Sequence, residues 1–76
     1  MKDLTLGIKI KLTTNPKTKS IFFKECNTGD VLSITSRINN GLKYVDIFNY
    51  TTGKNTTMLV GNFMRTLQTL HYIVIG

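Results

Sequence analysis

The Asn40-Gly41 pair lies midway in a run of alternating residues and constrains the fold more than any other feature of this chain. Both central residues of a two-residue type I′ hairpin turn take positive φ, and Asn followed by Gly adopts that geometry readily. The pair therefore predicts a β-hairpin over residues 31–50. Counting outward from the turn gives the cross-strand partners: Ile38 with Lys43, Arg37 with Tyr44, Thr35 with Asp46, and Ser33 with Phe48.

Side chains alternate between the two faces of such a hairpin. One face is apolar and is expected to face the core: Leu32, Ile34, Ile38, Val45 and Ile47. The other carries Arg37, Tyr44, Phe48 and Tyr50, among Ser33, Thr35 and Asp46. Rings interleaved with polar groups are typical of a binding surface. The alternative is a second, minor core, since a strongly bent small sheet can bury part of both faces.

The rest of the chain adds further strands to this hairpin. Period-two alternation and short apolar runs bounded by turn residues predict them at 4–12, 20–26, 55–60 and 71–75. In the second of these, Ile21 and Phe23 are expected to point inward, with Phe22 and Lys24 outward.

A short helix is expected before the last strand. Phe63, Leu67 and Leu70 recur at spacings of four and three, which predicts one or two helical turns with Asn62 as N-cap. Together these elements predict a single all-β domain over residues 1–76. We expect a small SH3-like barrel of five to six antiparallel strands with one short helical turn before the last strand, because closure removes exposed sheet edges.

The predicted order of a long first strand, a central meander, a helical turn and a final strand resembles SH3-like barrels. Within it, the step Thr28-Gly29-Asp30-Val31-Leu32 resembles the turn and strand that open KOW and Tudor-like modules. The bias toward Asn, Lys, Ile and Thr in so short a chain is similar to small accessory proteins of low-GC bacteriophages. An OB-type barrel is the main alternative fold.

The charge balance favours a polyanionic partner. Ten Lys and Arg against four Asp and Glu give a formal net charge of +6, which suits nucleic acid, a membrane surface or an acidic protein. The alternative is that this charge only keeps a small protein soluble.

Few residues are available for chemistry. His71 and Cys26 are the only ones of their types, which leaves little for acid–base or nucleophilic catalysis and no paired zinc ligands. The predicted strands allow the carboxylates of Asp30 and Asp46 to meet across strands. No glycine-rich phosphate loop is present. We therefore expect a protein that is not an enzyme and has no metal and no cofactor.

The single cysteine favours a reducing compartment. Residues 1–12 alternate in polarity, whereas a signal peptide needs a continuous apolar run, and no segment is long enough to span a bilayer. We expect a cytoplasmic protein, in the host cytoplasm if it is viral, with no membrane partner.

Nucleic acid, DNA or RNA, is the first candidate partner, because cations neutralise phosphates and aromatic faces stack on bases. The residues expected to carry this function are Lys9, Lys11, Lys17, Lys19, Lys24, Arg37, Tyr44, Phe48 and Tyr50. For the lysines, a solvated strand face is the alternative. If these five lysines each contact a phosphate of duplex DNA, affinity falls about 500-fold between about 50 and 200 mM salt.

The second candidate is a small phage-type protein that binds and modulates an acidic host protein or a replication or transcription complex. The same residues serve it, because Tyr and Arg are enriched at the centres of protein interfaces. Self-association into a homo-oligomer through this patch is a third use.

Overall fold

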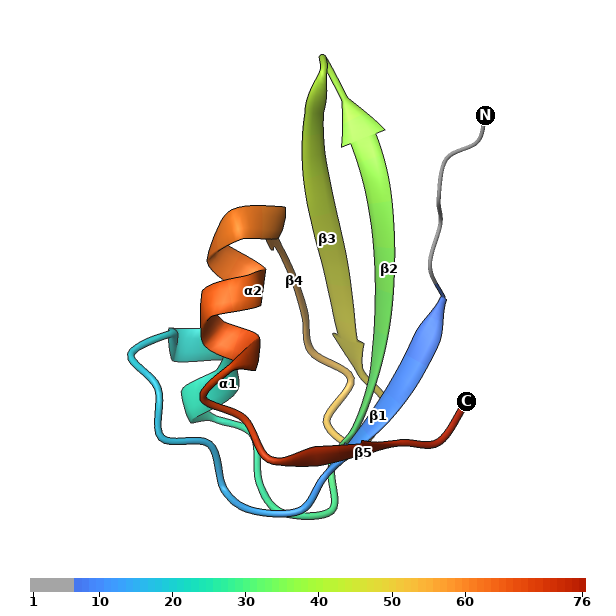
Figure 1. Ribbon diagram of the computed structural model, residues 1–76. Helices are drawn as coiled ribbons and strands as arrows, with labels where there is room; N and C mark the ends of the chain where they lie inside the picture. Colours follow the sequence, from blue (N-terminus) through green and yellow to red (C-terminus); the bar gives the residue numbers. More distant parts are fainter. Residues whose placement is uncertain (1–6) are drawn as a thin grey trace.

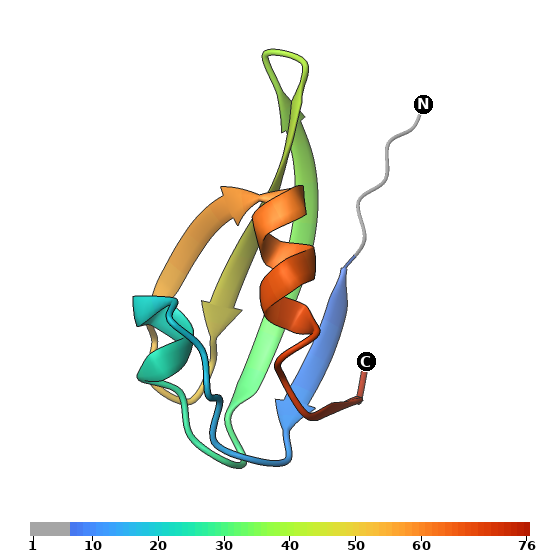
Figure 2. The same cartoon turned by 60° about the vertical axis from the view of Figure 1, so that its left-hand side comes forward.

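The computed structural model describes residues 7–76, in which five strands form one antiparallel sheet of order β4-β3-β2-β1-β5 (Figure 1). The elements in chain order are β1 (Ile8–Leu12), α1 (Ile21–Lys24), β2 (Val31–Asn39), β3 (Leu42–Asn49), β4 (Asn55–Leu59), α2 (Val60–Leu67) and β5 (Tyr72–Val74). Both helices lie on the same side of the sheet (Figures 1 and 2). We call that side the inner face and the opposite side the outer face; within residues 7–76, no helix covers the outer face.

The predicted hairpin is confirmed. Asn40 and Gly41 have φ angles of 53° and 77°, the positive values that a type I′ turn requires. All four predicted cross-strand pairs are present in the ladder between β2 and β3. Turn chemistry therefore fixes the register of the two longest strands.

The core lies between the inner face and the two helices. Its buried residues are Ile10, Leu12, Phe23, Cys26, Leu32, Ile34, Val45, Ile47, Phe63 and Leu70. Ile38, which we predicted in the core, is 54% exposed, so that prediction is wrong. The cause is the length of the hairpin: β1 pairs only with residues 31–34 and β4 only with residues 44–48, so the tip extends beyond the rest of the sheet (Figure 2).

The predicted strand at 20–26 is wrong, because Ile21–Lys24 forms the helix α1. Phe23 and Cys26 are buried together, and their spacing of three residues suits a helical turn. The Cys26 amide donates to the Phe23 carbonyl at 3.0 Å, which continues this turn. Phe23 points inward and Lys24 is exposed, as expected, but Ile21 is 76% exposed and Phe22 packs against the core.

The fold is mostly β, with a short helix before the last strand, as expected. The described sheet is not closed into a barrel, because its order leaves β4 and β5 as edges. Along the chain, α2 connects these two edge strands and lies over the inner face (Figure 2). Its Phe63 is buried in the core. The helix has eight residues, about two turns as predicted, but it begins at Val60, which packs against the core. Asn62 is therefore inside the helix, and its predicted role as N-cap is wrong.

The first and last strands lie where the alternation predicts them. The predicted strand over 4–12 is present at Ile8–Leu12, and its residues Leu4 and Leu6 lie outside the described part of the chain. The strand predicted at 71–75 is present at Tyr72–Val74, paired with β1. In the described part of the chain, no helix is long and apolar enough to cross a membrane.

Candidate functional site

The residues that we predicted to form one binding surface lie in two separate groups. Six belong to β1, β2, β3 and the turn that follows β3: Lys9, Lys11, Arg37, Tyr44, Phe48 and Tyr50. Three belong to α1 and the loop that precedes it: Lys17, Lys19 and Lys24. The structure therefore divides the predicted basic surface between the outer face and the helical side.

Phe48 and Tyr50 form an aromatic pair on the outer face. They are 36% and 53% exposed, and their rings meet edge to face with centroids 4.9 Å apart. Asn49, between them, is 1% exposed and points inward. Because neighbouring strand residues face opposite sides, the burial of Asn49 directs both rings outward. These two rings are thus not part of a second core within the described residues.

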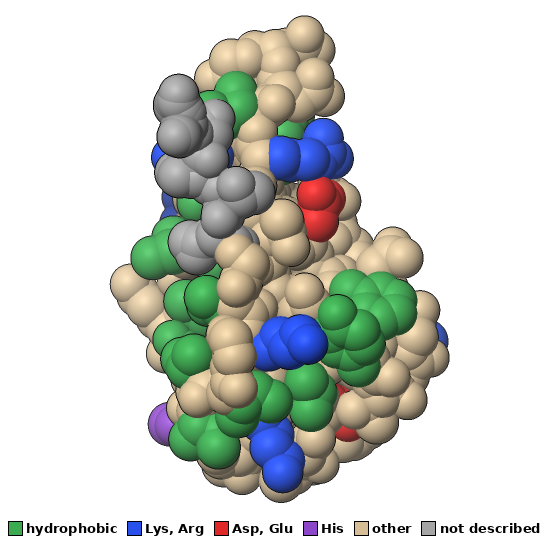
Figure 3. Space-filling view, turned by 90° about the vertical axis from the view of Figure 1, so that its right-hand side faces the viewer, with side chains coloured by type: hydrophobic (Ala, Val, Ile, Leu, Met, Phe, Trp, Pro, Cys, Tyr) green, Lys and Arg blue, Asp and Glu red, His purple; other side chains and the backbone are tan. Residues whose placement is uncertain are grey.

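Lysine side chains lie next to this aromatic pair. The Lys9 Nζ atom is 5.2 Å from the centroid of the Tyr50 ring, within the range of a cation–π contact. Lys11 follows on the same side of β1 and pairs in register with Val31 and Ile73. Figure 3 shows that cationic side chains lie between apolar groups on the outer face.

Arg37 and Tyr44 lie further along the hairpin and are already engaged. The Arg37 Nε atom donates to Asp46 Oδ2 at 2.7 Å, and its guanidinium lies 5.5 Å from the centroid of the half-buried Tyr44 ring. The Thr57 hydroxyl donates to the other oxygen of Asp46. Hydrogen bonds from Thr57 and Arg37 lower the pKa of Asp46 below its usual value. This end of the outer face offers less free charge and ring surface to a ligand than the Lys9 end.

A shallow hollow of about 280 Å³ lies beside Phe48 on the outer face. Hydroxyl and amide side chains from β2 and β4 contribute to its lining, among them Ser33, Thr35 and Asn55. In register, Ser33 and Asn55 flank Phe48 on either side. The exposed ring thus stands next to groups that can donate and accept hydrogen bonds.

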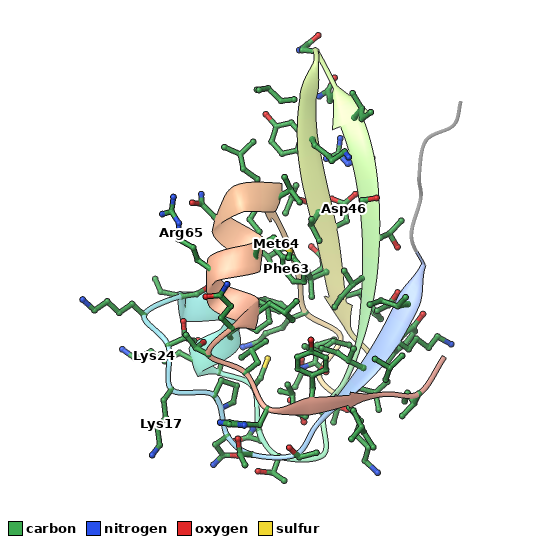
Figure 4. All side chains as sticks on the ribbon, viewed as in Figure 1. Lys17, Lys24, Asp46, Phe63, Met64 and Arg65 are labelled. Atoms are coloured by element: carbon green, nitrogen blue, oxygen red, sulfur yellow. The ribbon has the colours of Figure 1, made fainter. Side chains whose placement is uncertain are left out.

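The second group surrounds a larger, open hollow of about 900 Å³ on the helical side. Lys17, Lys19 and Lys24 line it together with Arg65 of α2, which the sequence prediction missed (Figure 4). A signal for Arg65 is present in the sequence. Asn62, Arg65, Thr66 and Thr69 recur at helical spacing and form a polar stripe beside the apolar one, and all four line the hollow.

A buried polar cluster holds the end of the sheet that carries the aromatic pair. Asn49 Nδ2 donates to Asp30 Oδ2 at 2.9 Å and lies 3.5 Å from Cys26 Sγ, while Asn49 Oδ1 accepts from the Thr51 amide at 2.8 Å. Asp30 is buried in this cluster, whereas Asp46 lies on the outer face, so the two carboxylates do not meet. Burial raises the pKa of the Cys26 thiol, which keeps it in the neutral form.

Within residues 7–76, no three side chains among His, Cys, Asp and Glu come together in a way that would hold a metal ion. No protein-family model, curated protein or solved structure matched this chain. The candidate site therefore rests on the geometry of its own residues: an aromatic pair with adjacent lysines on one face, and a basic hollow on the other.

Proposed function

We propose that this protein is a non-catalytic module that binds single-stranded nucleic acid through the outer face of its sheet. One observation carries the proposal: the exposed rings of Phe48 and Tyr50 lie beside the ammonium group of Lys9. Proteins that bind single strands combine aromatic faces, on which bases stack, with cations that follow the phosphates. The outer face supplies both within one short stretch of the sheet.

In this mode, a base stacks on Phe48 or Tyr50 while Lys9 and Lys11 neutralise neighbouring phosphates. The hollow beside Phe48 offers the Ser33 hydroxyl and other polar groups to the edge of a stacked base. Two phosphate contacts to a single strand give a modest salt dependence, about a 7-fold loss of affinity between about 50 and 200 mM salt. Ring stacking therefore supplies much of the binding energy.

The proposal also covers the fold family and the cellular location of the protein. We place the chain with SH3-like modules because β1 pairs with both β2 and β5 and because a helix precedes β5. The single cysteine supports a cytoplasmic location, in the host cytoplasm if the protein is viral.

A second candidate function is docking of an acidic protein partner on the same face. The observation that favours it is the exposed apolar surface near Lys11: Ile73 and Ile75 are 52% and 48% exposed. Apolar groups around cations suit a partner that presents carboxylates among apolar residues. A protein partner would contact the apolar area of Tyr50 and would not need to stack on the flat face of its ring.

The test measures fluorescence anisotropy of a labelled oligothymidylate at low salt. The Tyr50→Leu variant retains an apolar side chain and removes the stacking face, so we expect affinity to fall about 5- to 150-fold, the equivalent of about 1–3 kcal/mol. Lys9→Gln should weaken binding and flatten its salt dependence. Lys43→Gln is the matched control, because Lys43 is an exposed cation near the hairpin tip.

Two outcomes would contradict the nucleic-acid proposal. One is the absence of oligothymidylate binding by the unmodified protein at low salt. The other is an unchanged affinity in Tyr50→Leu, which would show that no base stacks on this ring. A protein that co-purifies from lysate after nuclease treatment, and is lost in Lys11→Glu, would support the second candidate instead.

A further inference from the structure

The basic hollow on the helical side gathers four cations from three segments of the chain. Lys17 and Lys19 come from the loop before α1, Lys24 from α1 and Arg65 from α2. Figure 4 shows Lys17, Lys24 and Arg65 extending on the helical side, away from the sheet that carries Asp46. The outer face and this hollow are therefore on opposite sides of the molecule.

No described carboxylate balances these four charges. Glu25 accepts from Lys54 at 2.8 Å, and Asp46 accepts from Arg37 at 2.7 Å. Asp30 is buried and bonded to Asn49. Within residues 7–76 every carboxylate side chain thus has another partner, while four like charges surround one open hollow. Such an arrangement raises the local concentration of anions.

The remaining lining indicates which anion the hollow suits. The hydroxyls of Thr66 and Thr69 donate to main-chain oxygens of α2, so the donors that remain in the lining are the ammonium and guanidinium groups with the neutral side chains of Thr18 and Asn62. No aromatic ring and no carboxylate lines the hollow. Charged donors without rings recognise phosphate groups and read neither base nor sequence.

We propose that this hollow is a second binding site, which takes the phosphate backbone of duplex nucleic acid. Its open shape admits a polymer, and the spread of its cations over three segments suits successive phosphates of one backbone. Binding at the hollow is independent of the outer face. The consequence that one molecule holds a single strand on one side and a duplex on the other rests on the function proposed above.

The experiment combines two probes with one pair of substitutions. Inorganic tripolyphosphate presents phosphates without bases, and a short labelled duplex presents the backbone. In ¹⁵N–¹H correlation spectra, both probes should shift amides of residues 17–24 and 62–69 and leave residues 48–50 unchanged. If the four cations each meet one phosphate, duplex affinity falls about 150-fold between about 50 and 200 mM salt.

The Lys24→Gln/Arg65→Gln double variant should reduce that salt effect to about 12-fold, because it removes two phosphate contacts. Both side chains are exposed, so the fold should persist, and dispersion of the amide spectrum verifies this. Lys43→Gln again serves as the control, with a salt dependence like that of the unmodified protein.

Unchanged duplex binding in the double variant would overturn the proposal. So would tripolyphosphate binding without duplex binding, which would remove nucleic acid as the ligand. The two proposals fail separately: Tyr50→Leu should weaken oligothymidylate alone, and the double variant should weaken duplex and tripolyphosphate. A protein whose hollow binds duplex but whose outer face binds no single strand retains this second site without the first function.

Discussion

Replacement of Asn49 by Ala should remove a large part of the stability of this protein. The side chain is 1% exposed and makes three hydrogen bonds to oxygen or amide partners: to Asp30 Oδ2 at 2.9 Å, and from the amides of Thr51 and Thr52 at 2.8 and 3.2 Å. At about 1 kcal/mol each, these contribute about 3 kcal/mol. The buried Asp30 also loses a donor, which costs about 1–3 kcal/mol more. We expect a loss of about 4–6 kcal/mol.

This loss is large for a chain of this size, because stability of about 0.05–0.15 kcal/mol per residue gives about 4–11 kcal/mol in total. Urea unfolding followed by circular dichroism measures it. Asn39→Ala is the matched control, because Asn39 is exposed on β2, and its substitution should change the free energy of unfolding by less than about 0.5 kcal/mol. A loss under about 1 kcal/mol in Asn49→Ala would refute the account of the buried cluster.

Asn49→Asp tests the same account by pH. The introduced carboxyl retains an oxygen for the Thr51 and Thr52 amides but replaces the donor that faces Asp30. Buried beside a second carboxyl, it should hold a proton in the folded state up to a higher pH than in the unfolded state. Stability is then retained below about pH 4 and lost as pH rises toward 7. Stability that rises with pH over this range would contradict the expectation.

Two further predictions concern titrating groups. Hydrogen bonds from Thr57 and Arg37 lower the pKa of Asp46, so its contribution is present above about pH 4 and is lost as pH falls through the lower folded pKa. Because this pair is exposed, Asp46→Asn should cost at most about 1 kcal/mol at pH 7 and less near pH 2; equal urea midpoint shifts at both would disprove a role for the charge. Burial raises the pKa of the Cys26 thiol, so the folded protein should react slowly with a disulfide reagent near pH 8, and the thiol should favour folding only until pH rises above about 9. Labelling as fast in buffer as in urea would show that Cys26 is accessible.

The hairpin was predictable because its signals are local. The Asn40-Gly41 turn and the alternation on either side fix each residue's partner and side, without knowledge of the rest of the fold. The outward direction of the aromatic pair follows from the same alternation. Which of the outward rings is covered was not predictable: Tyr44 is half-buried and Phe48 is not, and that difference depends on the neighbours that the fold brings to each.

The helix α1 was not predictable from the same kind of signal. Ile21 and Phe23 alternate, which suits a strand, but Phe23 and Cys26 share a helical spacing, and the two patterns overlap in a stretch of only seven residues. Packing of Phe23 into the core decides between them. The start of α2 was misplaced for a similar reason: Asn62 has the residue type of an N-cap, but Val60 packs against the core and begins the helix.

The basic hollow was beyond reach for a related reason. Its cations belong to segments more than forty positions apart, and only the packing of Phe23 and Phe63 into one core brings those segments together. Lys24 was a candidate because the sequence prediction placed it on the outward side of a strand, next to the lysines of the preceding turn. Arg65 was not, because its value to a site depends on what the neighbouring loop contributes.

Division of the positive charge between two sides has a consequence for how ligands bind. The molecule measures 35 × 25 × 21 Å, and the Debye length is about 10 Å at 0.1 M salt. Charges on the outer face and in the hollow are therefore largely screened from each other near physiological salt. A ligand on one side neither repels nor attracts a ligand on the other to a large degree, so substitutions on the two sides should act additively. Lowering the salt lengthens the Debye length toward the size of the protein, and only there should a polyanion on one side noticeably strengthen or weaken the other site.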